Sequence, residues 1–181
     1  MKKGLALALL CTTLLVACVH EPMNKSTPYN PQTDARVRVY FGVSTHFYFN
    51  TACEPQRGAL GYGGGGGMAV AKPRMLHLAN TTIGMPVPED AYRYYDEYVV
   101  KADQPLTITL DTGGWSQVNG FVITETRQHV AGSFVPRPGM DYEAFPGGNK
   151  GSLRLTVRQL RLEDERVQTE PMTADPAPLC R

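Results

Sequence analysis

Long apolar runs, an excess of charge of one sign and helical periodicity are all scarce in this 181-residue chain. The apolar stretch over residues 4–17 has 14 positions, fewer than the roughly 20 that a transmembrane helix needs. The 18 basic residues nearly balance the 17 acidic ones, so the composition gives no reason to expect nucleic acid or anionic lipid as a partner. No window repeats its apolar residues persuasively at helical spacing, which argues against a helical fold.

The first 18 residues have the order of a secretory signal, with two lysines followed by the short apolar stretch. The stretch closes with Leu15, Val16, Ala17 and Cys18, which resemble the lipobox of bacterial lipoproteins. The resemblance implies cleavage before Cys18, a diacylglyceryl thioether on its sulfur and an acyl chain such as palmitate on its freed amine. The alternative is an ordinary secretory signal cut after Ala17, whose ending also suits a general signal peptidase.

The same resemblance implies a location for the mature protein. In that family an Asp directly after the cysteine favours retention in the inner membrane, whereas this chain has Val19. The expected location is therefore the outer membrane of a Gram-negative cell, with the protein lipid-anchored on the periplasmic side. Several acyl chains on Cys18 would anchor it stably, because each buried methylene contributes about 0.8 kcal/mol.

The chain divides into four expected segments. We expect a signal peptide over residues 1–17, a lipidated Cys and flexible tether over 18–35, a folded domain over 36–162 and a C-terminal tail over 163–181. The tether is rich in proline and polar residues and has no apolar period. The 164 residues that remain after the 17-residue signal is removed suit one domain with a real core.

Cysteine is also scarce, with four in the chain. Cys11 would leave with the signal and Cys18 would carry lipid, so Cys53 and Cys180 are the two thiols left in an oxidising compartment. We predict a disulfide between them, which would stabilise the fold by about 4 to 5 kcal/mol in the chain-entropy model. It would pin the C-terminal tail to the body; the alternative is a free or intermolecular thiol.

Apolar and polar residues alternate with a period of two through most of the domain, which predicts strands. Val37, Val39 and Phe41 show this pattern near its start. The expected strands cover residues 36–43, 47–51, 95–101, 106–111, 118–126, 140–145 and 153–162. In the last of these the apolar phase shifts at Leu160, which suggests a β-bulge. The predicted class is all-β.

Residues 134–142, which include Pro138, Gly139 and Tyr142, resemble the tyrosine corner of immunoglobulin-like and fibronectin type III sandwiches. In those proteins a Tyr that enters a strand bonds back to the preceding turn. The alternative is a Pro-Gly turn followed by any strand. Together with the turn signals between strands, the resemblance implies a two-sheet β-sandwich, immunoglobulin-like or similar, rather than a barrel.

An aromatic cluster supplies the predicted partner-binding residues, which are Tyr92, Tyr94, Tyr95, Tyr98 and Trp115. Tyrosine combines apolar area with a hydrogen-bonding tip at low entropy cost, which suits a protein interface or stacking on a sugar. The alternative is that alternate tyrosines pack inside the sandwich while the others cover its edge, and that Trp115 caps the core.

Residues able to carry catalysis are thinly spread. His46, His77 and His129 have no second His or carboxylate at a metal-ligand spacing. Asp141 and Glu143 share one face of a strand. Two interpretations are open: the pair could serve acid/base chemistry, or it could belong to a solvated edge of the sheet. We therefore predict no catalytic residues, no metal and no cofactor.

These observations predict a non-catalytic binding, assembly or structural module of the cell envelope, held at the membrane through Cys18 and recruiting an unidentified envelope protein or polymer. One alternative is an immunity or inhibitor lipoprotein that blocks a toxic enzyme with the Gly-rich residues 58–72 and the tyrosines; an acidic, plug-like surface would favour it. Those Gly-rich residues do not form a phosphate loop, because no Gly-Lys-Ser/Thr follows them. A further alternative is a hydrolase of envelope polymer, which needs polar groups converging in a cleft.

Overall fold

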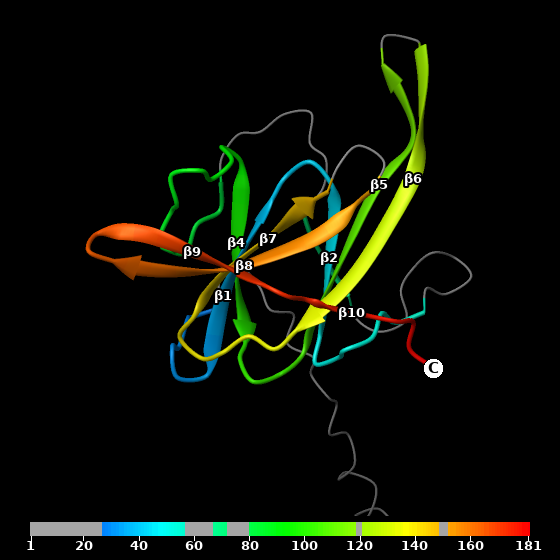
Figure 1. The fold of residues 1–181 in the computed structure, drawn as a ribbon. Helices are drawn as coiled ribbons and strands as arrows, with labels where there is room; N and C mark the ends of the chain where they lie inside the picture. Colours follow the sequence, from blue (N-terminus) through cyan, green and yellow to red (C-terminus); the bar gives the residue numbers. More distant parts are fainter. Residues whose placement is uncertain (1–26, 57–66, 72–79, 119–120, 149–151) are drawn as a thin grey trace, which may run out of the picture.

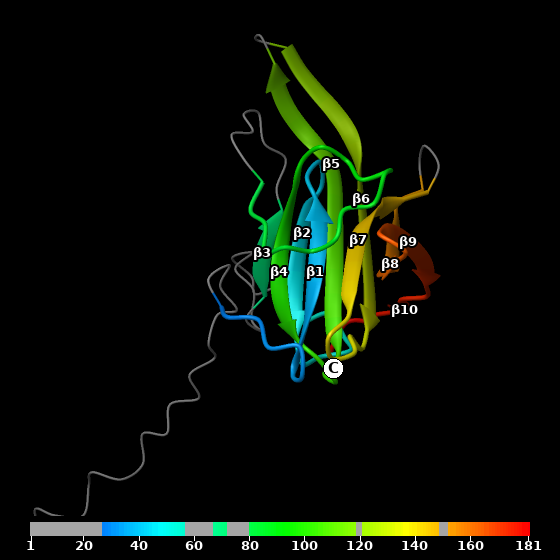
Figure 2. The ribbon, with the colours of Figure 1, turned by 90° about the vertical axis from the view of Figure 1, so that its left-hand side faces the viewer.

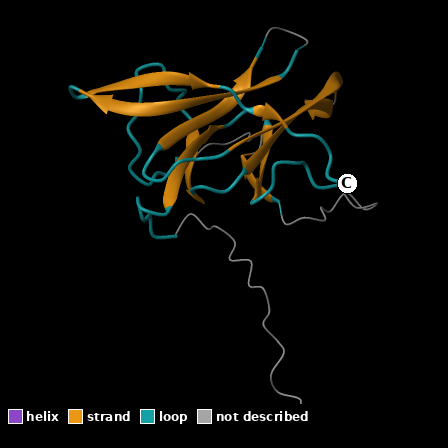
Figure 3. Cartoon of the chain, turned by 60° about the horizontal axis from the view of Figure 1, so that its bottom comes forward, coloured by secondary structure: helices purple, strands orange, loops and turns teal. Residues whose placement is uncertain are grey.

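The protein is represented by a computed structural model that describes residues 27–56, 67–71, 80–118, 121–148 and 152–181. Within these residues the chain forms ten strands in two five-stranded sheets, with loops between them (Figures 1 and 3). The predicted all-β, two-sheet sandwich is therefore confirmed. No helix long and apolar enough to cross a membrane occurs in the described part of the chain.

The first sheet, here called sheet 1, has the strand order β4-β1-β7-β8-β9. β1 runs parallel to β7, and the other neighbouring strands are antiparallel. The strands are β4 (Tyr95–Lys101), β1 (Asp34–Tyr40), β7 (Asp141–Gly147), β8 (Arg154–Glu163) and β9 (Arg166–Met172).

The second sheet, sheet 2, has the order β10-β6-β5-β2-β3 and is antiparallel throughout. Its strands are β10 (Asp175–Pro176), β6 (Phe121–Phe134), β5 (Leu106–Val118), β2 (Ser44–Phe49) and β3 (Met68–Ala71). The β2–β3 register shifts between Thr45 and His46, where the pairing is irregular.

The core lies between the two sheets because alternate side chains of each strand point inward. Val37 and Tyr142 from sheet 1 and Ile108 from sheet 2 belong to one apolar cluster, and none of them is measurably exposed. The sheets approach closely at Gly132 of β6, where an added Cβ would meet the side chain of Leu155 at 2.9 Å. A larger residue at Gly132 would therefore require the side chain of Leu155 to move.

β5 and β6 continue beyond the body of the sandwich as a long hairpin, which we call the arm (Figures 1 and 2). Their register shifts between Thr112 and Gly114, and Gly113 has φ +80°, a conformation that other residues rarely adopt. The strand expected over residues 118–126 combines the last residue of β5 with the distal part of β6, and residues 119–120 lie outside the described part of the chain. The rest of β6 was missed because its exposed side chains do not alternate with apolar ones near the base of the arm.

The sandwich extends beyond the predicted boundaries of 36–162 at both ends. β1 begins at Asp34, and Asp34 and Ala35 are already buried, so the body starts within the segment assigned to the tether. β9 and β10 lie in the segment assigned to the tail, where β9 completes sheet 1 and β10 pairs with β6. The sequence hid β9 because it is an edge strand whose side chains are mostly exposed.

The β-bulge predicted at Leu160 is wrong, because β8 pairs with both β7 and β9 without a register shift. The apolar phase changes for another reason. Leu155 and Val157 face the core, whereas Leu160 is buried on the outer face of sheet 1, near Pro86 and other apolar side chains. Both faces of β8 are therefore covered along part of its length.

Tyr142 bonds back to the turn that precedes β7, as residues 134–142 had suggested. Its hydroxyl accepts a hydrogen bond from the backbone N–H of Arg137 at 3.0 Å, and its ring packs against Phe134 with 5.3 Å between centroids. The turn is thereby fixed to the strand it introduces. Kinship with immunoglobulin-like proteins stays a prediction.

Cys53 and Cys180 form a disulfide, with their Cα atoms 5.1 Å apart, which confirms the predicted pairing. Backbone hydrogen bonds surround it: the N–H of Glu54 donates to the carbonyl of Pro178, and the N–H of Cys180 donates to the carbonyl of Glu54, both at 2.8 Å. The segment that follows β2 and the C-terminal segment are thus joined both covalently and by hydrogen bonds.

Candidate functional site

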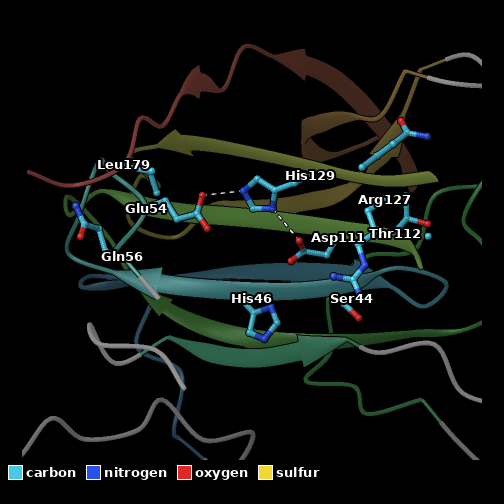
Figure 4. Close-up of a pocket in the computed structure, with 11 residues that line it drawn as sticks. Ser44, His46, Glu54, Gln56, Asp111, Thr112, Arg127, His129 and Leu179 are labelled. Carbon is cyan, nitrogen blue, oxygen red and sulfur yellow. Dashed lines mark hydrogen bonds and ion pairs between the residues drawn. The ribbon is translucent and has the colours of Figure 1, made fainter. Parts of the chain in front are cut away.

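A hollow of about 1030 Å³ lies on the outer face of sheet 2 (Figure 4). Side chains that alternate with the core residues of β2, β5 and β6 line it, together with residues near the disulfide. The lining consists of Ser44, His46, Glu54, Gln56, Asp111, Thr112, Gly113, Arg127, Gln128, His129 and Leu179. Most of the lining residues are therefore polar or charged, with charges of both signs.

Strand register places Ser44, Asp111 and His129 in one row across this hollow. Asp111 of β5 is the partner of Ser44 on β2 and of His129 on β6. A carboxylate therefore stands between the hydroxyl and the imidazole. Figure 4 shows Asp111 and Glu54 approaching the imidazole of His129 from different sides.

The imidazole of His129 is held by two carboxylates, an arrangement that we call the histidine clasp. Its Nδ1 lies 2.8 Å from Oδ1 of Asp111, and its Nε2 lies 2.7 Å from Oε2 of Glu54. The side chain of His129 is 40% exposed, whereas that of Glu54 is 8% exposed. Because Glu54 follows Cys53, the clasp links β6 to the disulfide-bearing segment.

The carboxylates of the clasp change the acid–base properties of its imidazole. Burial lowers the pKa of His129, but the hydrogen bonds and charges of Asp111 and Glu54 outweigh it, so the pKa lies above its ordinary value. The imidazolium form suits this geometry, because both ring nitrogens then carry a proton that they donate to a carboxylate.

The clasp is poorly arranged for hydrolysis. A general-base histidine needs one ring nitrogen available to take a proton from a nucleophile or a water. Both nitrogens of His129 already contact carboxylates, and no serine or threonine hydroxyl within the described ranges bonds to this ring. Nucleophilic catalysis by His129 would first require one arm of the clasp to open.

Metal binding is not favoured by the geometry either. Among the residues that the structure describes, no group of three or more His, Cys, Asp or Glu side chains is arranged to hold a metal ion. His46 faces the same hollow as His129, so two of the three histidines singled out from the sequence do share one site. His77 lies outside the described residues.

The outer face of sheet 1 differs from that of sheet 2, because residues 80–94, which we call the strap, cross it (Figure 2). Beneath the strap, Arg38 contacts Oε1 of Glu97 at 2.6 Å and Oε1 of Glu143 at 2.7 Å, and all three side chains are at most 1% exposed. Arg38 also donates to the backbone carbonyls of Met85 and Pro86. The strap therefore supplies acceptors that a buried guanidinium needs.

Two further arginines extend this buried network. Arg158 donates to Glu143 at 2.6 Å and to both oxygens of Asp90 on the strap. Arg36 forms a two-point contact with Asp141 at 2.6 and 2.7 Å. Asp141 and Glu143 are thus buried partners of arginines, rather than a solvated edge or an isolated acid/base pair.

Protonation in this network is fixed by the same contacts. Burial lowers the pKa of Arg38, but its hydrogen bonds to Glu97 and Glu143 raise it above the ordinary value. Burial raises the pKa of Tyr40, and its hydrogen bond to Glu143 adds to the effect. Arg38 therefore stays charged and Tyr40 stays neutral across the physiological pH range.

The predicted partner-binding tyrosines occupy different environments. Tyr92 and Tyr94 on the strap are 64% and 38% exposed. Tyr95 is half-buried beneath Arg38, whose guanidinium carbon lies 4.5 Å from its ring centroid. The edge of Tyr40 packs against Tyr92 and Tyr95, with centroids 5.2 and 6.0 Å away.

Tyr98 belongs to the core and must be removed from the predicted contact surface. It is 3% exposed, its ring packs against Phe47, and its hydroxyl donates to the carbonyl of Val70. Alternation explains the difference, because Tyr98 points inward whereas its neighbours in sequence point outward or lie on the strap. The side chain of Trp115 lies outside the described part of the chain, as do residues 57–66 and 72 of the Gly-rich segment.

The histidine clasp could not be found in the sequence, because its residues are brought together by long-range pairing. Glu54 lies 75 positions before His129, and Asp111 lies 18 positions before it. The only available signal was that Asp111 and His129 face each other if residues 106–134 form one hairpin. That hairpin was not recognised at full length.

No protein-family model matches the chain, and no curated protein or solved structure matches it either. The described residues define a two-sheet β-sandwich with the Cys53–Cys180 disulfide, a strap across sheet 1 and an open hollow on sheet 2.

Proposed function

We propose that the protein is a lipid-anchored module of the bacterial cell envelope that binds a partner without catalysing a reaction. The lipobox-like residues 15–18 support the anchoring, and Val19 supports the outer membrane as its location. The body would lie near the membrane surface on the periplasmic side, because the tether is short. Its partner would be an envelope protein or polymer.

The observation that carries the non-catalytic part is the histidine clasp. Both nitrogens of the His129 imidazole already contact carboxylates. This favours a structural role over proton transfer. Exposed Tyr92 and Tyr94 and the apolar side chains near them offer the kind of surface that binding proteins use.

Intact-mass measurement of the protein purified from a bacterial envelope tests the anchoring. We expect a chain that starts at Cys18 and carries one diacylglyceryl group and one acyl group. Cys18→Ala should abolish acylation and release the protein from the membrane fraction, whereas the matched variant Cys11→Ala should leave both unchanged. An unmodified start at Cys18, or a retained signal, would overturn the proposal.

A second candidate function is an immunity or inhibitor lipoprotein, which one observation favours. The turn between β8 and β9 is acidic, with Glu163, Asp164 and Glu165 all exposed. Such a turn could enter the basic cleft of an enzyme. The test is inhibition of the product of an adjacent gene: nanomolar inhibition that is lost when the three residues are replaced by Gln and Asn would select this function.

A further inference from the structure

A groove of about 930 Å³ runs over the outer face of sheet 1, between the strap and the β8–β9 hairpin. Its walls and floor are mostly apolar, with Pro86 and Val87 on the strap, Leu160 and Leu162 on β8 and Val167 on β9. The ion pair between Arg36 and Asp141 lies at one side and is satisfied within the protein. The groove therefore presents apolar surface that no described segment fills.

The rim of the groove is more exposed than its floor. Leu160 on the floor is 3% exposed, whereas Val87, Met140 and Leu162 around it are 51%, 38% and 66% exposed. Three of the largest exposed apolar side chains in the described residues thus gather at one place. A cluster of this kind marks an interaction surface more often than scattered apolar residues do.

The groove continues into a polar hollow of about 500 Å³, which shares Val87 and Val167 with it. Glu89 and Asp90 line this hollow from the strap, and Glu165 and Arg166 line it from the hairpin. Asp90 is paired with Arg158, but Glu89 and Glu165 have no ion-pair partner in the part of the chain that the structure describes. Because Arg158 offsets Asp90, the charges left in this hollow are those of Glu89, Glu165 and Arg166, so this end of the groove has an excess of carboxylate.

We propose that this groove docks a segment of a partner protein in which apolar side chains stand next to lysine or arginine. The apolar part would cover Val87, Met140 and Leu162, and the basic part would meet Glu89 and Glu165. The inference rests on the proposed function as a binding module and specifies the chemistry of its partner.

Charge decides between this occupant and two others. An anionic membrane surface would be repelled by the carboxylates at the end of the groove and by Glu163 and Asp164 in the adjoining turn. A second copy that used the same face would bring the same excess of carboxylate to the interface, so that excess would stay uncompensated. A basic and apolar protein segment satisfies both parts of the groove.

Peptide binding to the full mature chain in phosphatidylcholine nanodiscs tests the proposal. The probes are three synthetic twelve-residue peptides: one with three leucines flanked by arginines, one with the arginines replaced by glutamates, and one with the leucines replaced by serines. Surface plasmon resonance is recorded against empty nanodiscs. We expect the arginine–leucine peptide alone to bind, with an affinity that falls as salt is raised.

Two variants and one control locate the binding. Leu162→Ser should weaken binding about tenfold or more, because serine removes the apolar area that the leucine would bury against the partner. Glu165→Gln should weaken it less and reduce its dependence on salt. Val135→Ser, which removes an exposed apolar side chain outside the groove, should change nothing.

Equal binding of all three peptides, or binding of the arginine–leucine peptide that Leu162→Ser leaves unchanged, would overturn the proposal. So would either rival occupant: binding of the chain to protein-free vesicles of phosphatidylethanolamine and phosphatidylglycerol through Leu162, or a dimer that Leu162→Ser dissociates. If the protein is acylated but the arginine–leucine peptide does not bind in the groove, this inference is wrong and the proposed anchoring still stands. Absence of acylation removes the proposed anchoring, and the same peptides then test the groove on the unacylated chain.

Discussion

The outer faces of the two sheets use the same kind of contact, a cation between two carboxylates, in opposite settings. On sheet 1, Arg38 is sealed beneath the strap between Glu97 and Glu143, with all three side chains at most 1% exposed. On sheet 2, His129 lies between Asp111 and Glu54 at the surface of an open hollow and is 40% exposed. The first contact is permanent, whereas the second can change with pH.

The difference lies in the cation and in what covers it. A guanidinium stays charged at any physiological pH, so burying Arg38 requires acceptors that the strap carbonyls and two carboxylates supply. An imidazolium loses its charge near neutral pH, so the clasp is strong only while His129 is protonated. The contacts on sheet 1 therefore fix the position of the strap at any physiological pH. On sheet 2, the contact between His129 and the disulfide-bearing segment depends on protonation of His129.

The largest expected effect comes from Arg38→Met. This change leaves Glu97 and Glu143 buried without their cation, which costs about 3 to 5 kcal/mol. Urea unfolding followed by circular dichroism measures the loss. The matched control is Arg161→Met, whose ion pair with Glu170 is exposed on both sides and should contribute less than about 1 kcal/mol. Equal losses in the two variants would contradict the distinction between a buried and a surface ion pair.

The disulfide ranks next, because it closes a loop of 127 residues on the sheet 2 side. Cys53→Ala combined with Cys180→Ala should lower the free energy of unfolding by about 2 to 5 kcal/mol. The C-terminal segment should also exchange its backbone amide hydrogens faster, since the hydrogen bonds of Glu54 and Cys180 depend on it. An unchanged unfolding midpoint, with the wild type shown to be oxidised, would count against a stabilising role.

A smaller effect, on the order of 1 kcal/mol, is expected from the pH dependence of the clasp. The pKa of His129 is raised in the folded protein, so its stabilising contribution is complete below about pH 6.5 and is lost as the pH rises through the raised value. Wild-type stability should therefore fall more between pH 6.5 and 9 than that of His129→Gln. Parallel stability curves for the two proteins would show that the clasp does not titrate in this range.

The sequence predicted regular strands well and the outer faces poorly. β4 was expected over the residues that it occupies, and its inward-facing Tyr98 and Val100 belong to the core cluster. Arg36 and Arg38 alternate with the core residues of β1 and lie on its outer face, yet the strap buries Arg38. Nothing local in residues 80–94 indicates that this segment crosses a sheet, since its anchors lie on β1, β4 and β8.

The smallest effect on stability is expected from a substitution of Tyr92. This substitution distinguishes a role of the strap in binding from a role in packing. Its ring is 64% exposed and contacts Tyr40 only at an edge, so Tyr92→Ala should cost about 0.5 kcal/mol or less. If the strap is a contact surface, the same change should reduce copurification of the envelope partner while the unfolding midpoint stays in place. Tyr98→Ala is the opposite case, because its ring lies in the core and its loss should destabilise the fold. A large destabilisation by Tyr92→Ala would assign that ring to the packing of the strap rather than to binding.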